Sequence, residues 1–520
     1  MFRKTFPWIS AAALLFSFEA TAQNATIPTS EPSCFSPCDA LISADLTSRI
    51  LLTTSPLFEP QVQSYWATNA RLRPCCFFLP HTTEELSLAI TTLSSLSNST
   101  QDTNNVEEDW HIAIRSGGHS YPGSNNIEAG LTIDFSHMNA SWYNASTSLV
   151  SLQPGGRWRD VYAHLHETAN VTVTGGRDGD VGVGGFMLGG GNSYHSGKNG
   201  FACDTVVNYE VVLANGSVVQ ANADENPELF RALKGGGMNF GIVTRFDAQA
   251  MPAVDLAYGQ HVMAANNSLP VIDAVVDFTE HAEQTKADHL IALYLHGPGS
   301  SDMIIAIRVN TEGDLNTTSF DKITEISAIK ESWSHTSLAA AANSSQVQSG
   351  TMNVGFTLTF RVDAEVMRYA AALQDEMVKS LGARIGEDNF MAQMFFQPLP
   401  AYYSKIGEGK VWNMLGLDRI GGNAILWTAG VGVVGDNTTA FAVAEAEMRD
   451  LTANLKEFTV RNDKASGFVY LNYADRTQDP LGSYGLENLD FMEEVAAKYD
   501  PEGWWQRMVP GGFKLSRADT

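Results

Sequence analysis

The stretch AIRSGGHSYPG, residues 113–123, brings an arginine, two consecutive glycines and a histidine together directly after an apolar run. Glycine has no Cβ, so Gly117 and Gly118 can adopt positive φ and let backbone N–H groups approach a ligand closely. His119 would then present a ring nitrogen to that ligand. The alternative is a surface hairpin that carries an ordinary histidine, and these residues alone do not separate the two.

Glycine turns recur at residues 182–191 and 235–241. Neither common nucleotide motif fits them, because the string G-x-x-x-x-G-K-[ST] does not occur and GVGGFMLGGG lacks the spacing of G-x-G-x-x-G. Several backbone loops that close on one long, partly anionic ligand would explain the pattern. A flavin dinucleotide is such a ligand, since its pyrophosphate needs backbone donors and its flat ring needs a close approach.

The composition narrows the function classes. The chain has 520 residues, of which 44% are hydrophobic, and this favours two domains with sizeable cores. Its formal net charge of −25 argues against nucleic acid and anionic membrane surfaces, because both would repel it. No apolar stretch is long enough to cross a bilayer. We expect a monomer whose partner is a small molecule.

Residues 1–22 have the pattern of a secretory signal peptide. Arg3 and Lys4 provide the positive region, an apolar run follows, and the tripeptide ATA at residues 20–22 resembles a cleavage site. An excess of N-x-[ST] sequons also predicts a secreted glycoprotein. They stand at Asn24, Asn98, Asn139, Asn144, Asn170, Asn215, Asn266, Asn316, Asn343 and Asn437.

The cysteines fit an oxidising compartment. Two bridges between the pair Cys34 and Cys38 and the pair Cys75 and Cys76 are predicted, with the connectivity left open. Cys203 is left over and is expected to be a buried free thiol. No histidine stands at ligand spacing from these cysteines, so no metal site is predicted.

The chain changes character after about residue 250. Before it, strand-like and helix-like runs alternate with glycine turns, and NYEVVLANGSVVQA carries the Asn-Gly signal of a hairpin. Residues 251–460 alternate apolar strands with helix-like runs, which is an α+β pattern around an antiparallel sheet. Residues 461–520 are predicted to form a strand, a loop and a helix.

Five strings taken together carry a resemblance. They are IRSGGHSYPG, VGVGGFMLGGG, GFACDTVVNYEVVLANGSVV, ENPELFRALKGGGMNFGIVTRF and YLNYAD…YGLEN…KYDPEGWW. In this order, over about residues 60–510, they look like the berberine-bridge-enzyme-like flavoproteins of the vanillyl-alcohol-oxidase superfamily. A further string, NMLGLDRIGGNAILW, resembles fungal members of secondary metabolism.

The resemblance implies an α+β fold with two domains. A two-part PCMH-type FAD-binding domain would span residues 23–250, and a substrate domain with an antiparallel sheet covered by helices would span 251–460. Residues 461–520 would return to the FAD-binding domain. The implied cofactor is FAD.

The resemblance also implies roles for single residues. His119 matches the histidine that bonds covalently to the 8α carbon of the flavin, and Tyr473 matches a tyrosine that acts as base. Asn472 accompanies it on the C-terminal strand, and Asn488 matches an asparagine near the isoalloxazine. The predicted cofactor-binding residues are Arg115, Ser116, Gly117, Gly118, His119, Ser120, Asp178, Val181, Gly182, Gly184, Gly185, Gly189, Gly190, Asn472 and Asn488.

One position departs from the family. Many members have a second flavin-linking cysteine where this chain has Asp178, so a single covalent tether is predicted. Arg177 and Asp178 would face the flavin or the substrate; the alternative is a surface ion pair. Val181 could influence oxygen access, and His195 is weighed as a loop histidine or an active-site contact.

The resulting reading is a secreted FAD-dependent oxidase that removes a hydride from an alcohol, an amine or a secondary metabolite and passes electrons to O₂, giving H₂O₂. A tyrosine acting as base needs a neighbouring positive charge or proton acceptor, which the sequence does not name. For Tyr473 the alternative is a core aromatic. Two further readings of the protein stay open: a dehydrogenase with another acceptor, or a flavin-loaded cyclase or binding protein without net redox turnover.

Overall fold

A four-stranded sheet carries the histidine-containing stretch at residues 113–123. In the computed structural model, which describes residues 36–101, 110–121, 123–406 and 411–518, the histidine loop follows a buried strand. The sheet has the order β1 (Ile50–Leu52), β2 (Cys76–Phe78), β4 (Leu131–Asp134) and β3 (Ile112–Arg115). Strands β3 and β4 are parallel, so the segment between them is a crossover and the alternative of a simple hairpin is wrong.

A five-stranded antiparallel sheet completes the glycine-rich half. Its order is β5 (Ser141–Asn144), β6 (Leu149–Leu152), β10 (Ile242–Gln249), β8 (Val206–Val212) and β9 (Val218–Asn222). Strands β8 and β9 form the predicted hairpin; Gly216 in its turn has φ +80°. The accompanying helices are α1 (Ser36–Leu41), α2 (Phe58–Gln63), α3 (Thr83–Gln101), α4 (Trp158–Ala169), α5 (Val183–Leu188), α6 (Ser196–Asn199) and α7 (Pro227–Leu233), and the short strands β7 (Val171–Thr172) and β11 (Met251–Pro252) pair with each other.

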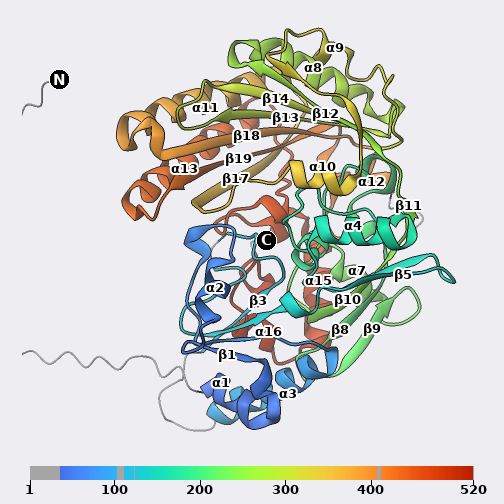
Figure 1. Cartoon of the computed structure of the whole chain (residues 1–520), viewed down its shortest axis with the longest axis vertical. Helices are drawn as coiled ribbons and strands as arrows, with labels where there is room; N and C mark the ends of the chain where they lie inside the picture. Colours follow the sequence, from blue (N-terminus) through green and yellow to red (C-terminus); the bar gives the residue numbers. More distant parts are fainter. Residues whose placement is uncertain (1–35, 102–109, 122, 407–410, 519–520) are drawn as a thin grey trace, which may run out of the picture. The chain divides into compact units, whose positions relative to one another are not determined.

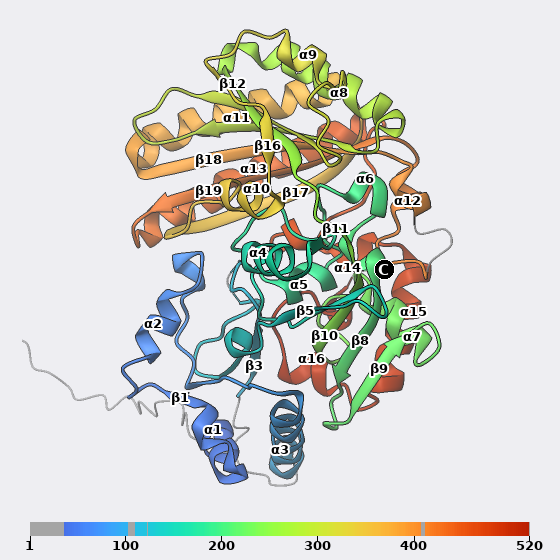
Figure 2. The same cartoon turned by 45° about the vertical axis from the view of Figure 1, so that its right-hand side comes forward.

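The predicted antiparallel sheet is confirmed as an eight-stranded one. Its order is β15 (Lys330–Glu331), β12 (Leu256–Ala264), β14 (Met303–Asn310), β13 (Asp288–His296), β18 (Phe390–Leu399), β19 (Ala424–Val434) and β17 (Thr351–Arg361), with β16 (Ser334–Thr336) paired to β12. Three long helices, α8 (Ser268–His281), α11 (Ala364–Ile385) and α13 (Thr438–Arg461), pack side by side over it (Figures 1 and 2). Shorter helices are α9 (Asp321–Thr324), α10 (Leu338–Ser344) and α12 (Tyr403–Ile406).

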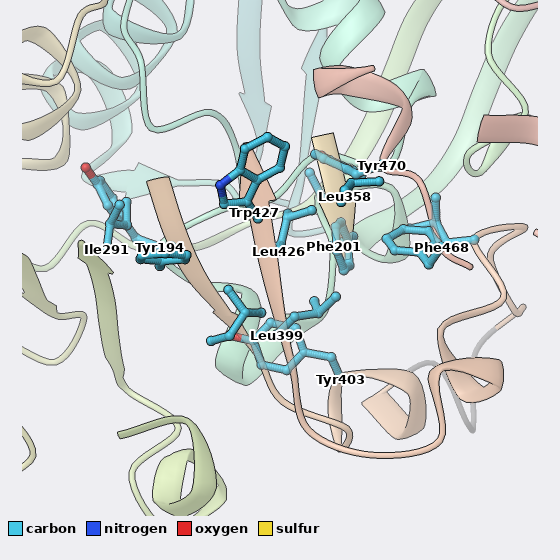
Figure 3. Packing of buried hydrophobic residues seen from close by; sticks show 14 of the residues in the cluster. Tyr194, Phe201, Ile291, Leu358, Leu399, Tyr403, Leu426, Trp427, Phe468 and Tyr470 are labelled. Atoms are coloured by element: carbon cyan, nitrogen blue, oxygen red, sulfur yellow. The ribbon is translucent and has the colours of Figure 1, made fainter. Parts of the chain in front are cut away.

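The C-terminal segment packs into the core but is not the predicted strand. Figure 3 shows Phe468 and Tyr470 close to Phe201, near Leu358 of β17 and its register partner Trp427 of β19. Residues 471–473 form a 3₁₀ turn. Helices α14 (Pro480–Ser483), α15 (Leu486–Tyr499) and α16 (Trp504–Met508) follow.

The strand prediction fails because local partners satisfy the backbone of this segment. The N–H of Tyr473 donates to the carbonyl of Tyr470 at 3.0 Å. The N–H of Val469 donates to Ser483 Oγ at 3.0 Å. A backbone N–H that is taken in this way is not available to a neighbouring strand.

The cysteine predictions hold where the structure describes them. Cys38 and Cys76 form a disulfide, Cys75 is also disulfide-bonded, and Cys203 is a buried free thiol. Cys34 and the predicted signal peptide, residues 1–22, lie outside the described residues. Within the described part of the chain, no helix combines the length and the apolar character that crossing a membrane requires.

Candidate active site

One cavity of about 590 Å³ lies between the glycine loops and the eight-stranded sheet. This volume falls in the range of cofactor and small-molecule pockets. On the sheet side, β18 turns every second residue inward. These inward residues are Met391, Gln393, Phe395 and Gln397, which face the cavity together with Thr428, Gly430 and Gly432 of β19.

On the other side, two glycine loops touch backbone to backbone. A Cβ added to Gly117 would lie 2.5 Å from the backbone nitrogen of Gly182. Ser116 Oγ fastens the same two loops, since it donates to the carbonyl of Pro154 at 2.5 Å and accepts from the N–H of Gly184 at 3.1 Å. Only glycine permits this approach, which explains why the two motifs are glycine-rich.

The imidazole of His119 lies in this cavity. Its ring stacks on Trp66 with 4.5 Å between ring centroids and 9° between planes. Its Nε2 is buried and, among the described residues, has no hydrogen-bond partner. Burial lowers the pKa of His119, against an opposing effect of the carboxylate of Asp178, and so favours the neutral ring with a free lone pair.

Asp178 faces His119 and not Arg177. Its Oδ2 lies 3.7 Å from His119 Nε2 and accepts the N–H of Val347 at 2.8 Å. Its Oδ1 accepts the N–H of Asp180 at 2.8 Å. The alternative of a surface ion pair between Arg177 and Asp178 is therefore wrong.

Arg177 reaches the hydroxyl group that was predicted to be the base. Its Nη2 donates to Tyr473 Oη at 2.5 Å and to Gln397 Oε1 at 2.6 Å. Its Nη1 lies 3.0 Å from His289 Nε2. Tyr473 Oη in turn donates to Gln397 Oε1 at 3.3 Å. Arg177 is thus the positively charged neighbour of the Tyr473 hydroxyl group.

His289 and His195, near the guanidinium of Arg177, are both held neutral by burial. Burial, and then the charge of Arg177, hold the pKa of His289 well below its usual range, so its Nε2 can accept from the guanidinium. Burial also lowers the pKa of His195 to about 4. His195 does not line the main cavity. No carboxylate of the described residues lies within ion-pair distance of Arg177, so all its partners are uncharged.

Comparison with known proteins identifies the family of the chain. A family model described as an FAD binding domain matches residues 74–222. An FAD-dependent monooxygenase from Emericella nidulans is 33% identical, over 92% of this chain and 98% of the relative. Another from Aspergillus calidoustus is 34% identical, over 88% of this chain and 86% of the relative.

The chain belongs to the family of FAD-linked oxidoreductases that includes these two relatives.

Solved structures share the fold of this oxidoreductase. The wild-type BBE-like 1 protein of Physcomitrella patens gives a TM-score of 0.68 at 16% identity, over 90% of this chain and 97% of that chain. A xylooligosaccharide oxidase from Myceliophthora thermophila gives 0.70 at 18% identity, over 93% of this chain and 100% of that chain. The predictions of family, fold class and FAD as cofactor are thus confirmed.

The residues around the cavity of this oxidoreductase fit FAD. The matched FAD-binding segment contains both glycine loops. A Cβ added to Gly185 would meet nothing within 4 Å, so the backbone of this loop is open toward the cavity. His119 Nε2 is a buried polar atom without a partner among the described residues, which a native structure rarely leaves unexplained.

Most predicted site residues meet at this cavity. They are Ser116, Gly117, Gly118, His119, Ser120, Asp178, Val181, Gly182, Gly184, Gly185, Asn472 and Tyr473. Four do not line it. Arg115 pairs with Asp134 at 3.0 Å, Gly189 lies against Asn472, and Gly190 lies against Leu415. Asn488 donates to the carbonyls of Met414 and Tyr484, both at 3.3 Å.

Sequence reasoning missed three residues of the site. Gln397 and His289 complete the surroundings of Arg177, and Trp66 stacks on His119. Gln397 had a signal, because it stands four residues after Gln393 in an otherwise apolar strand and both point inward. His289 and Trp66 had none, since their partners are distant in sequence.

Proposed function

We propose that this oxidoreductase is a secreted oxidase that removes a hydride from a C–H bond of a small alcohol, amine or secondary-metabolite substrate. In the net reaction the substrate loses two hydrogens and O₂ gains them as H₂O₂. The observation that carries the proposal is that His119 and the pair Tyr473 and Arg177 line one cavity.

Bound FAD supplies the acceptor for the hydride. Tyr473 accepts the proton of the substrate O–H or N–H through its oxygen. Arg177 stabilises the negative charge of that oxygen by a hydrogen bond from its guanidinium. Gln397 and His289 fix the guanidinium through neutral acceptors, and their neutrality leaves its charge available to Tyr473.

A single covalent tether through His119 is part of the proposal. The glucooligosaccharide oxidase of Acremonium strictum, with 18% identity and a TM-score of 0.68 over 90% of this chain and 97% of that chain, carries a 6-S-cysteinyl, 8α-N1-histidyl FAD. This chain has the histidine but an aspartate where the resemblance places the cysteine. One sulfur-free attachment is therefore proposed.

Secretion has support from the surface and from a disulfide. Eight of the predicted sequons have asparagines whose exposure the structure describes, and all eight are exposed; they are Asn139, Asn144, Asn170, Asn215, Asn266, Asn316, Asn343 and Asn437. The Cys38–Cys76 bridge suits an oxidising compartment.

We also propose the domain boundaries 23–250, 251–460 and 461–520, since the eight-stranded sheet uses only residues from 256 to 434.

A second candidate is oxygen insertion. The relatives from Emericella nidulans and Aspergillus calidoustus are named monooxygenases. A monooxygenase that takes its two electrons from the substrate would transfer one atom of O₂ into the product and release the other as water. The product would then gain an oxygen atom, whereas the oxidase product has only lost two hydrogens.

Anaerobic mixing with candidate alcohols, amines and hydroxylated aromatics tests the proposal. The flavin absorbance should bleach with a true substrate, and admission of air should restore it with one H₂O₂ formed per product. If the absorbance bleaches but returns only slowly in air, the protein is instead a dehydrogenase. Restoration without H₂O₂, with an oxygen atom in the product, would identify a monooxygenase.

A further inference from the structure

Asp178 makes contacts beyond those of an ordinary turn residue. Its Oδ1 closes a local turn with the N–H of Asp180, which is common for aspartate. Its Oδ2 accepts from Val347, 169 residues away in the sequence. The same Oδ2 lies 3.7 Å from Nε2 of His119.

Among the described residues, one carboxylate lies within 4 Å of Nε2 of His119, and it belongs to Asp178. Trp66 covers the face of the ring and fixes its plane. Nε2 is buried without a hydrogen bond among the described residues. Asp178 is the one carboxylate among the cavity-lining residues that the structure describes. A proton on Nε2 would therefore point to this carboxylate.

The loop between α10 and β17 holds both neighbours of the histidine. The N–H of Val347 binds Asp178 at 2.8 Å, and the carbonyl of Gln348 accepts from Trp66 Nε1 at 2.9 Å. The N–H of Gly350 donates to the carbonyl of Trp66 at 2.9 Å. The carboxylate and the indole are thus fixed on one support on both sides of the ring.

We propose that Asp178 is a positioning residue and proton acceptor for His119 while the flavin tether forms. The proposal rests on the proposed tether. In net terms, an N–H of the imidazole and a C–H of the 8α methyl group are lost, an N–C bond forms, and O₂ takes the two hydrogens as H₂O₂.

The carboxylate contributes in two ways. A proton kept on Nε2 leaves the lone pair on Nδ1, which makes that nitrogen the nucleophile. As the new bond forms, the ring becomes positively charged, and an adjacent carboxylate stabilises that charge and accepts the proton. The aspartate therefore assists the one remaining tether at the position where relatives have the second.

The test follows tether formation and not turnover. Protein produced under riboflavin limitation is mixed with FAD in air, and the fraction of flavin that stays with the acid-precipitated polypeptide is measured over time. Asp178→Asn should slow this at least tenfold while FAD still binds reversibly. Asp180→Asn, on the same loop but paired with Arg159 outside the cavity, affects His119 only through a weaker charge effect than that of Asp178 and should slow tethering much less.

A rescue experiment separates chemistry from structure. Asp178→Ala should regain part of its rate when formate, a small carboxylate, is added. An unchanged rate in Asp178→Asn, or equal slowing in Asp180→Asn, or no effect of formate, would overturn the proposal. Wild-type protein that releases all its flavin in acid would refute the tether itself, and this result is distinguishable because it needs no variant.

Discussion

At the residue scale, Arg177 determines what the cavity can do. Its guanidinium donates to a phenol and to an amide, and its third neighbour is an imidazole held neutral by burial. A positive charge without a carboxylate partner acts on whatever negative charge develops beside it. In the proposed reaction that charge develops on the oxygen of Tyr473.

Replacing this guanidinium should cost activity without unfolding the protein. Arg177→Met removes a donor to a developing oxyanion, and such losses lower kcat by about 10²–10³. Arg177→Lys should retain more activity, since it keeps the charge but not the fork of donors.

Steady-state kinetics under saturating O₂ check this prediction. Arg159→Met is the matched control, because Arg159 pairs with Asp160 and Asp180 and does not line the cavity. An Arg177→Met variant with turnover within twofold of wild type would mean that Tyr473 does not depend on the guanidinium.

At the element scale, the contact between two glycine loops shapes the flavin site. The predictions of both loops came from glycine spacing, which the backbone contact of Gly117 and Gly182 explains. The glycine spacing could not predict that the two loops contact each other, because only the folded chain brings Gly117 and Gly182 together.

Alanine substitutions at Gly182 and Gly185 should differ in their effect on protein stability. Gly182→Ala would force a Cβ into the backbone of Gly117, and such overpacking costs about 1–3 kcal/mol. Gly185 lies inside helix α5, where an added Cβ meets nothing within 4 Å, so Gly185→Ala should keep or raise the melting temperature without FAD. If the loop binds FAD, the added methyl group should still reduce flavin content.

Thermal denaturation of flavin-free protein and flavin absorbance per polypeptide measure the two effects. Equal stability of the two variants would contradict the account of the loop contact. Full flavin content in Gly185→Ala would contradict the assignment of this loop to FAD.

The elements that sequence analysis predicted are those with strong local patterns. The hairpin β8–β9 has an Asn-Gly turn, and α8, α11 and α13 have helical periodicity and bury apolar residues. Strand β18 was not singled out, because its inward residues include Gln393 and Gln397. The strand predicted around Tyr473 was wrong, because side chains and a local turn satisfy its backbone there.

At the scale of the whole molecule, buried histidines should make stability depend on pH. The pKa of His195 is about 4 in the folded protein against 6.5 when exposed, so the unfolded chain binds more protons between these values. The pKa values of His119 and His289 are also lowered by burial. Stability should therefore fall as the pH decreases from 6.5.

His195→Asn isolates one contribution. Its free energy of unfolding should depend less on pH, with a slope reduced by up to about 1.4 kcal/mol per pH unit below the exposed value. Denaturant unfolding at several pH values above 5 (roughly, where carboxylates stay ionised) gives the slopes. An identical slope in wild type and variant would show that His195 titrates equally in both states.

Across the molecule, the sequence predicted many of the residues that line the cavity, but not which residues they contact there. His119, Asp178 and Tyr473 were named from motifs, and all line one cavity. Their partners Trp66, Val347 and Gln397 come from other parts of the chain, and only folding brings them together. Asn488 was also predicted for the site, yet it packs against backbone carbonyls outside the cavity.

The most direct test of the account is the fate of the flavin on unfolding. Holoenzyme is precipitated in acid, and the yellow absorbance of pellet and supernatant is compared for wild type, His119→Ala and the exposed-histidine control His281→Ala. The account predicts flavin in the pellet for wild type and His281→Ala, and none for His119→Ala. Flavin released equally by all three proteins would contradict it.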